Sequence, residues 1–138
     1  MRSRQSVKVV ADSHALIWFT QDSSQLSARA AQAMQEAEAT DGIAVSVATL
    51  VDLWWVTQTT ERVSTRELSE LRGLLMATSA VDLYPIDVDV ADAYTRISRE
   101  SLKDPWDRFI VATALVLRAP LVTRDGAIHK SVLVETVW

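Results

Sequence analysis

The chain has 138 residues, of which 49% are hydrophobic and 23% charged, a composition typical of a globular domain that can bury a core. The absence of Cys excludes disulfides and thiolate metal sites, and no apolar run reaches the ~18–20 residues of a membrane span. A net charge of −4 argues against a protein that coats nucleic acid non-specifically, but it leaves room for an enzyme with a local basic rim. We expect a single cytoplasmic domain over residues 1–138, with a flexible tail at 1–6.

Strands and helices are predicted to alternate along the chain. Short β-branched or apolar runs predict strands at 7–11, 43–46, 81–86, 120–123 and 134–137. Apolar periodicity and capping residues predict helices at 14–19, 27–38, 48–55, 65–75, 90–98 and 105–117. This alternation predicts an α/β fold, a three-layer α/β/α domain with a central parallel sheet of four or five strands. Pro85 cannot donate a ladder hydrogen bond, so the third strand is expected at an edge of the sheet.

Acidic residues stand at places that this fold would bring together. Asp12 follows the first strand and Asp125 follows the fourth, and the carboxyl ends of parallel strands share one edge of the sheet. Asp104 and Asp107 lie three positions apart at the start of a helix, and therefore on one face of it. Asp52 lies inside an apolar helix, where it has no capping role, so it is either a ligand or the partner of an Arg.

Carboxylates that converge repel one another unless they are protonated or bound to cations. Oxygen ligands without Cys suit Mg²⁺ or Mn²⁺, and such a site can position a water and offset charge on a phosphodiester during its cleavage. Each acid also has a structural interpretation. The run 104–107 fits an N-cap, a proline at N1 and an acid at N3, Asp12 could cap a helix, and 125–126 could be a turn.

Four motifs, in order and at matching spacing, resemble those of PIN-domain ribonucleases, and most of all the VapC toxins of bacterial toxin–antitoxin pairs. These motifs lie at 9–18, 45–54, 104–114 and 121–125, the last with the family's Thr-x-Asp ending. The resemblance implies a metal-dependent endoribonuclease that leaves a 5′-phosphate, with Mg²⁺ as the cofactor and Mn²⁺ as a possible substitute. It also implies a cognate antitoxin protein as the partner, operator DNA bound only through that antitoxin, no membrane partner, and a homodimer.

The resemblance assigns roles to five aspartates. Asp12, Asp107 and Asp125 fall on the family's metal-binding, catalytic acids, and Asp104 falls on an accessory acid. Asp52 stands where the family normally has Glu, and it is carried over as a catalytic acid and metal ligand whose carboxylate is one methylene shorter.

Two other functions remain open at this stage. With Asp in place of Glu at position 52, the chain could be a catalytically weak PIN module that acts by binding RNA or protein. A phosphatase of the haloacid-dehalogenase type also has an aspartate after its first strand, but it needs a second aspartate two positions later, where this chain has His14.

Several other residues near the motifs carry expectations of their own. Arg124 and Arg108 flank the acids; they either pair with phosphate or balance the carboxylates, and the second interpretation is favoured. Trp18, Trp54 and Trp55 lie in apolar helices and are expected mainly in the core. Because Trp54 and Trp55 are adjacent and cannot face the same way, one of them could instead line a surface groove in which an antitoxin helix docks. By the resemblance, Thr123 would orient the site, while His14 is expected to face solvent or to be hydrogen-bonded.

Overall fold

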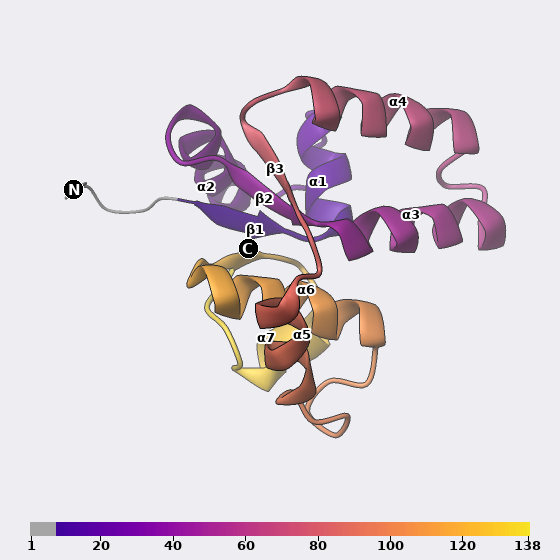
Figure 1. Cartoon of the computed structure of the whole chain (residues 1–138). Coiled ribbons are helices and arrows are strands. Elements are labelled where there is room, and N and C mark those ends of the chain that lie inside the picture. The colour runs from indigo at the N-terminus through magenta and orange to yellow at the C-terminus, as the bar shows by residue number, and fades with distance from the viewer. Residues whose placement is uncertain (1–7) are drawn as a thin grey trace.

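Five parallel strands form the centre of the computed structural model, which describes residues 8–138 (Figure 1). The strands are β1 (Val9–Ala11), β2 (Ile43–Ser46), β3 (Val81–Tyr84), β4 (Leu121–Val122) and β5 (Thr136–Val137). They pair in the order β3-β2-β1-β4-β5, and each pair is parallel. The predicted α/β fold with a parallel sheet is confirmed, and the sheet has five strands. The predicted tail at 1–6 and the first residue of the predicted strand 7–11 lie outside the described residues.

Seven helices surround this sheet in the described part of the chain. They are α1 (Ser13–Thr20), α2 (Ala28–Ala39), α3 (Val47–Thr59), α4 (Thr65–Ala77), α5 (Val88–Thr95), α6 (Pro105–Leu117) and α7 (Gly126–Ser131). Helices α1 and α2 lie on one side of the sheet, and α5, α6 and α7 lie on the other (Figure 1). None of the helices within residues 8–138 combines the length and the apolar character that crossing a membrane requires.

The alternation of side chains along β1 builds two separate cores. Val9 and Ala11 pack into a cluster with residues of α1 and α2, whereas Val10 packs into a second cluster with α5 and α6. Successive residues of a strand point to opposite faces, so a strand covered on both faces reads as a continuous apolar run. Val10 and Ala11 are fully buried, and the sheet edge beyond them is therefore held rigidly.

Three observations refine the predicted elements. Strand β3 ends at Tyr84, before Pro85, and lies at an edge of the sheet as predicted. Helix α7 was not predicted, because 125–126 was interpreted as a turn. Trp54 and Trp55 are 49% and 54% exposed, because α3 and α4 run side by side beyond the sheet (Figure 1). The expectation that both lie in the core is therefore wrong, and the alternative of a surface position agrees with the structure.

Candidate functional site

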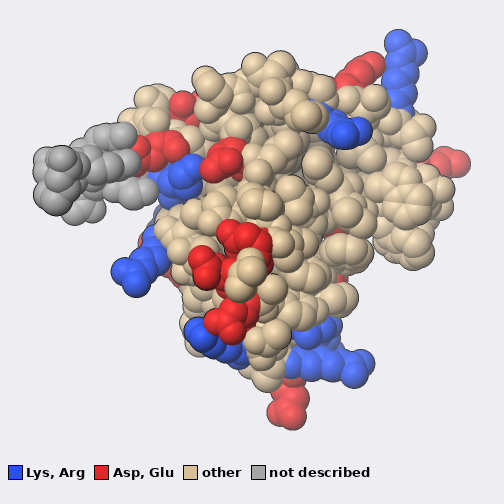
Figure 2. Space-filling view, viewed as in Figure 1, with Lys and Arg blue, Asp and Glu red and all other residues tan. Residues whose placement is uncertain are grey.

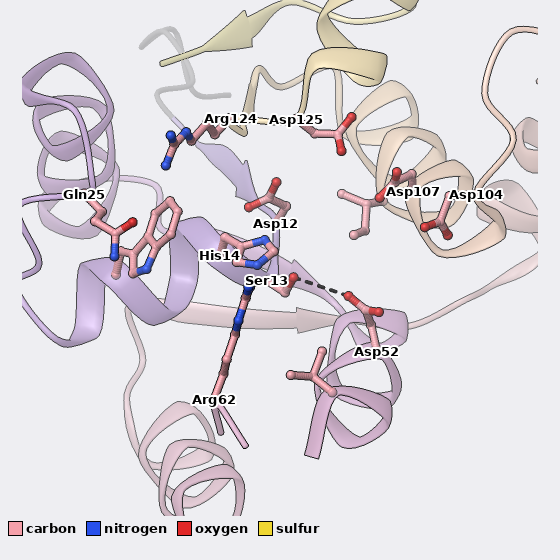
Figure 3. Close-up of a pocket in the computed structure, with 13 residues that line it drawn as sticks. Asp12, Ser13, His14, Gln25, Asp52, Arg62, Asp104, Asp107, Arg124 and Asp125 are labelled. Atoms are coloured by element: carbon pink, nitrogen blue, oxygen red, sulfur yellow. Dashed lines mark hydrogen bonds between the residues drawn. The ribbon is translucent and has the colours of Figure 1, made fainter. Parts of the chain in front are cut away.

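One pocket of about 540 Å³ at the C-terminal edge of the sheet collects all the aspartates that the sequence singled out (Figure 3). They come from the ends of β1 and β4, from α3, and from the start of α6. The acids that line the pocket are Asp12, Asp52, Asp104, Asp107 and Asp125. The expectation that the fold would bring these residues together therefore agrees with the structure.

Asp12 is both a helix cap and a buried acid of the pocket. Its Oδ1 atom accepts a hydrogen bond from the backbone N–H of Ala15 at 2.9 Å, which caps α1, and its Oδ2 atom accepts one from the hydroxyl of Thr123. The side chain is only 7% exposed, and this burial raises the pKa of Asp12, although the two hydrogen bonds oppose the increase. The capping role and the site role thus coexist in one carboxylate.

Thr123 and Asp125 shape the end of β4. The hydroxyl of Thr123 accepts a hydrogen bond from the backbone N–H of Asp125 at 3.0 Å while it donates to Asp12. Asp125 in turn caps α7, since its Oδ1 atom accepts from the N–H of Ile128 at 2.9 Å. One hydroxyl therefore sets the positions of two of the acids, in agreement with the orienting role that the resemblance implied.

His129 contacts the backbone of Thr123, and this histidine was not identified from the sequence. Its Nε2 atom lies 2.7 Å from the carbonyl oxygen of Thr123, and its Nδ1 atom lies 2.8 Å from the hydroxyl of Thr136. A carbonyl can only accept, so Nε2 must carry the proton and donate. The only signal in the sequence is a polar residue on a helix too short to be predicted, which explains why His129 was missed.

Asp104 and Asp107 open α6 and differ in their surroundings. Asp104 is the N-cap, with its Oδ1 atom 2.8 Å from the backbone N–H of Trp106 and Pro105 in the first helical turn. Asp107 is half-buried, and no hydrogen bond or ion pair reaches its carboxylate from residues 8–138. Burial raises the pKa of Asp107 from its ordinary value of 3.8 to about 7, and the negative charges of the other four aspartates add to the increase.

Asp52 lies half-buried on α3, within reach of α1. Its Oδ2 atom accepts a hydrogen bond from the hydroxyl of Ser13 at 3.3 Å, and burial raises its pKa (Figure 3). No arginine pairs with Asp52 in the part of the chain that the structure describes, so the interpretation of Asp52 as an arginine's partner is wrong. Sequence reasoning also missed two polar residues that line this pocket from loops, Gln25 and Arg62.

The donor set of the pocket suits a hard divalent cation. All the acids supply carboxylate oxygens, which Mg²⁺ and Mn²⁺ prefer. Burial is the main cause of the raised pKa of Asp107, and the negative charges of the other four aspartates add to it; a bound cation would relieve that repulsion. As the side chains of residues 8–138 stand, no group of three or more His, Asp or Glu is arranged to hold a metal ion. The residues nevertheless fit the ion in chemistry and charge.

Comparisons with known proteins identify a family and, separately, the fold. The family model for the PIN domain matches residues 9–131. Ribonuclease VapC22 of Mycobacterium tuberculosis (strain ATCC 25618 / H37Rv) is 31% identical over 134 residues, which cover 94% of this chain and 98% of that protein.

Two solved structures share the fold over nearly their whole length. The crystal structure of VapBC2 from Rickettsia felis, bound to a DNA fragment from their promoter, has a TM-score of 0.67 at 12% identity and covers 94% of this chain and 96% of that chain. The crystal structure of FitAcB from Neisseria gonorrhoeae has a TM-score of 0.61 at 18% identity and covers 93% of this chain and 95% of that chain. At these identities the similarity shows the fold.

Proposed function

Because the chain belongs to the PIN domain family, we propose that it is a metal-dependent endoribonuclease, the toxin of a toxin–antitoxin pair. The observation that carries the proposal is Asp107, a half-buried carboxylate without a hydrogen-bonding partner among residues 8–138, in a pocket shared with four other aspartates. If these acids served only to cap helices, the protein would not gather five of them in one cavity, since their mutual repulsion is unfavourable.

We assign the metal ligands from the acids of the pocket. Asp12, Asp107 and Asp125 would hold Mg²⁺ or Mn²⁺, with Asp104 as an accessory acid and Asp52 as the remaining catalytic acid and ligand. When bound, such a cation lowers the pKa of a water and offsets negative charge on a phosphodiester.

The residues around the acids supply the positioning. Thr123 holds Asp12 and the backbone of Asp125, and Ser13 holds Asp52, so three of the acids are kept in place before substrate arrives. Asp107 is the acid left without a hydrogen bond from residues 8–138, and burial raises its pKa to about 7. In the reaction a water attacks the phosphorus, the bond to the 3′-oxygen breaks with a proton passing to that oxygen, and a 5′-phosphate remains.

The partners belong to the same proposal. A cognate antitoxin would block the acidic pocket, and operator DNA would be bound only through it; the likeness to VapBC2 and FitAcB supports this assignment. We further propose that the chain acts as a single domain, as a homodimer and in the cytoplasm, the compartment that holds its RNA substrates.

Cleavage of a broad panel of RNAs tests the proposal. The wild type should cut in Mn²⁺ or Mg²⁺ and should stop cutting in EDTA. Asp107→Asn and Asp12→Asn should each lower the rate about a hundredfold or more. Asp22→Asn is the matched control, because Asp22 is exposed, lies outside the pocket, and has a positive φ of 52° that Asn tolerates.

The same RNA panel distinguishes the nuclease from the second candidate function, a module that binds without cutting. The shorter carboxylate of Asp52 favours a catalytically weak module that binds RNA or protein. If the wild type binds RNA but never cuts faster than Asp12→Asn, the enzyme is ruled out and the binding module stands. If Asp107→Asn and Asp12→Asn cut as fast as the wild type, the pocket is not the active site.

A further inference from the structure

The pocket that holds the aspartates has two unlike walls. In Figure 3, Asp104, Asp107 and Asp125 lie on one side, whereas Arg62, Arg124 and His14 lie on the other; Trp18 also lines the pocket, beneath Arg124. The residues of this second side are His14, Trp18, Arg62 and Arg124, and we refer to them as the cationic wall. The proposed metal site uses none of these four residues.

The guanidinium of Arg124 lies over the ring of Trp18. Its guanidinium carbon lies 5.7 Å from the centre of the Trp18 ring. The ring is itself fixed, because it packs on the core and lies 5.7 Å from the ring of Trp138 and 5.4 Å from that of His14. No ion pair joins Arg124 to an acid within the described residues, although Asp125 is its neighbour in sequence. The favoured expectation, that Arg124 balances the carboxylates, therefore has no direct ion pair to support it within the described residues.

Arg62 reaches the same wall from the loop between α3 and α4. In Figure 3 its side chain extends from that loop toward His14 and Ser13. Within residues 8–138 its guanidinium forms no ion pair. Arg108, the other arginine near the acids, behaves differently. It donates to the carbonyl oxygen of Lys103 at 3.3 Å and lies over the ring of Tyr94, outside the pocket.

The protein carries a net negative charge, so the cationic wall is needed to bind a polyanion such as RNA. The net charge is −4, and the face shown in Figure 2 carries a cluster of acidic side chains. That face shows no continuous basic stripe. A cation held by the acids would offset charge only at the phosphodiester bond that is cut. The neighbouring phosphates of a strand would still meet a protein of net negative charge unless a local group bound them.

We propose that Arg124 and Arg62 bind the phosphates next to the phosphodiester bond that is cut, with Trp18 holding the Arg124 guanidinium in position. The guanidinium fork matches the oxygens of a phosphate in a bidentate manner, and stacking on Trp18 reduces the freedom that Arg124 would lose on binding. The ligand is the sugar–phosphate backbone of an RNA strand. This inference rests on the proposed ribonuclease function, because it places the strand across the acidic wall.

Binding without metal tests the inference apart from cleavage. The probe is a short fluorescein-labelled single-stranded RNA in EDTA, and anisotropy is followed over a series of salt concentrations. Arg124→Ala should raise Kd about tenfold or more, and it should reduce the slope of log K against log salt by about 0.7, the change for one lost phosphate contact. Arg62→Ala should reduce the slope by a similar amount.

Two control variants test whether the effect is specific to the pocket and whether it depends on charge alone. Arg72→Ala removes an exposed arginine on α4 that lines none of the described pockets, and it should leave Kd and slope unchanged. Arg124→Lys keeps the charge but loses the fork, so it should restore the slope and only part of the affinity. Circular dichroism melting of each variant shows that the fold is kept.

The possible outcomes separate this inference from the function on which it rests. If Arg124→Ala and Arg62→Ala bind with the affinity and slope of the wild type, or if the wild type binds no RNA, the inference is overturned. If both slopes fall but the wild type never cleaves RNA, the phosphate site stands and the nuclease proposal is lost.

Discussion

The hydroxyl of Thr123 donates a hydrogen bond to the Oδ2 atom of Asp12, although 111 positions of sequence separate the two residues. The bond exists because β1 and β4 are neighbours in the sheet, with Ala11 paired to Val122. Thr123 is fully buried and Asp12 nearly so, and in a buried setting an unmade hydrogen bond is costly. The same hydroxyl accepts from the N–H of Asp125, so removing it should disturb both acids.

Thr123→Val keeps the shape of the side chain and removes its hydroxyl. We expect Mn²⁺ affinity to fall about 10- to 100-fold, the usual effect of losing a group that orients a metal ligand. Isothermal titration with Mn²⁺ measures this, and Thr123→Ser, which keeps the hydroxyl, should stay close to the wild type. If the Thr123→Val and Thr123→Ser variants bind Mn²⁺ with the same affinity, the hydroxyl of Thr123 does not orient the acids.

The raised pKa of Asp107 predicts how the stability of the metal-free protein changes with pH. Between pH 3.8 and about 7 the folded protein keeps a proton on Asp107 that the unfolded chain has lost. Stability should therefore fall as the pH rises through this range and level off above it. Burial raises the pKa of Asp12 and Asp52 as well, so both act in the same direction.

Urea unfolding in EDTA across this pH range measures the effect, and Asp107→Asn should show a smaller decline than the wild type. Mn²⁺ should raise the melting temperature more above pH 7 than below it, because the ion competes with the proton for the carboxylate. An equal decline in wild type and Asp107→Asn would show that Asp107 titrates normally.

The buried hydroxyl of Thr49 leads to a prediction of a substitution that stabilises the protein. Its hydroxyl is fully buried and finds no hydrogen-bond partner among residues 8–138. Thr49→Val removes the unpaired group at nearly constant volume, and it should raise the free energy of unfolding by about 1 kcal/mol. Thr113→Val is the control, since the equally buried hydroxyl of Thr113 donates to the carbonyl of Phe109 at 2.8 Å and its loss should destabilise by about 1 kcal/mol. Equal urea midpoints for the two variants would contradict the prediction.

The acids of the pocket were predictable because their placement follows from backbone topology. Asp12 and Asp125 end parallel strands, and Asp104 and Asp107 begin a helix, so strand order and helix direction alone bring them to one edge. The cap and the ligand were treated as alternatives for Asp12, but the structure shows the capping bond and the pocket together, because a carboxylate has two oxygens.

Other features depend on tertiary contacts that leave no periodic signal. Helix α7 has six residues and begins with Gly126, so its intrinsic propensity is low; the cap by Asp125 and the bonds of His129 hold it. Arg62 comes from a polar loop, and nothing local indicates that the loop faces the pocket. Trp54 and Trp55 were expected in the core because an apolar helix usually lies there, but α3 extends past the sheet that would have covered them.

Asp52 offers the most direct test of how this chain departs from the family pattern. Its carboxylate is held by Ser13 at 3.3 Å, at the long end of the range for a hydrogen bond, and it is one methylene shorter than the Glu that the resemblance implies. Asp52→Glu would carry the carboxylate farther into the pocket, so we expect it to tighten Mn²⁺ binding about tenfold. Asp52→Asn should weaken binding, since the amide loses the charge while keeping the shape. The Mn²⁺-dependent rise in melting temperature measures both effects. If Asp52→Glu binds Mn²⁺ as weakly as Asp52→Asn, the carboxylate at position 52 acts through Ser13 on the local packing and takes no part in holding the ion.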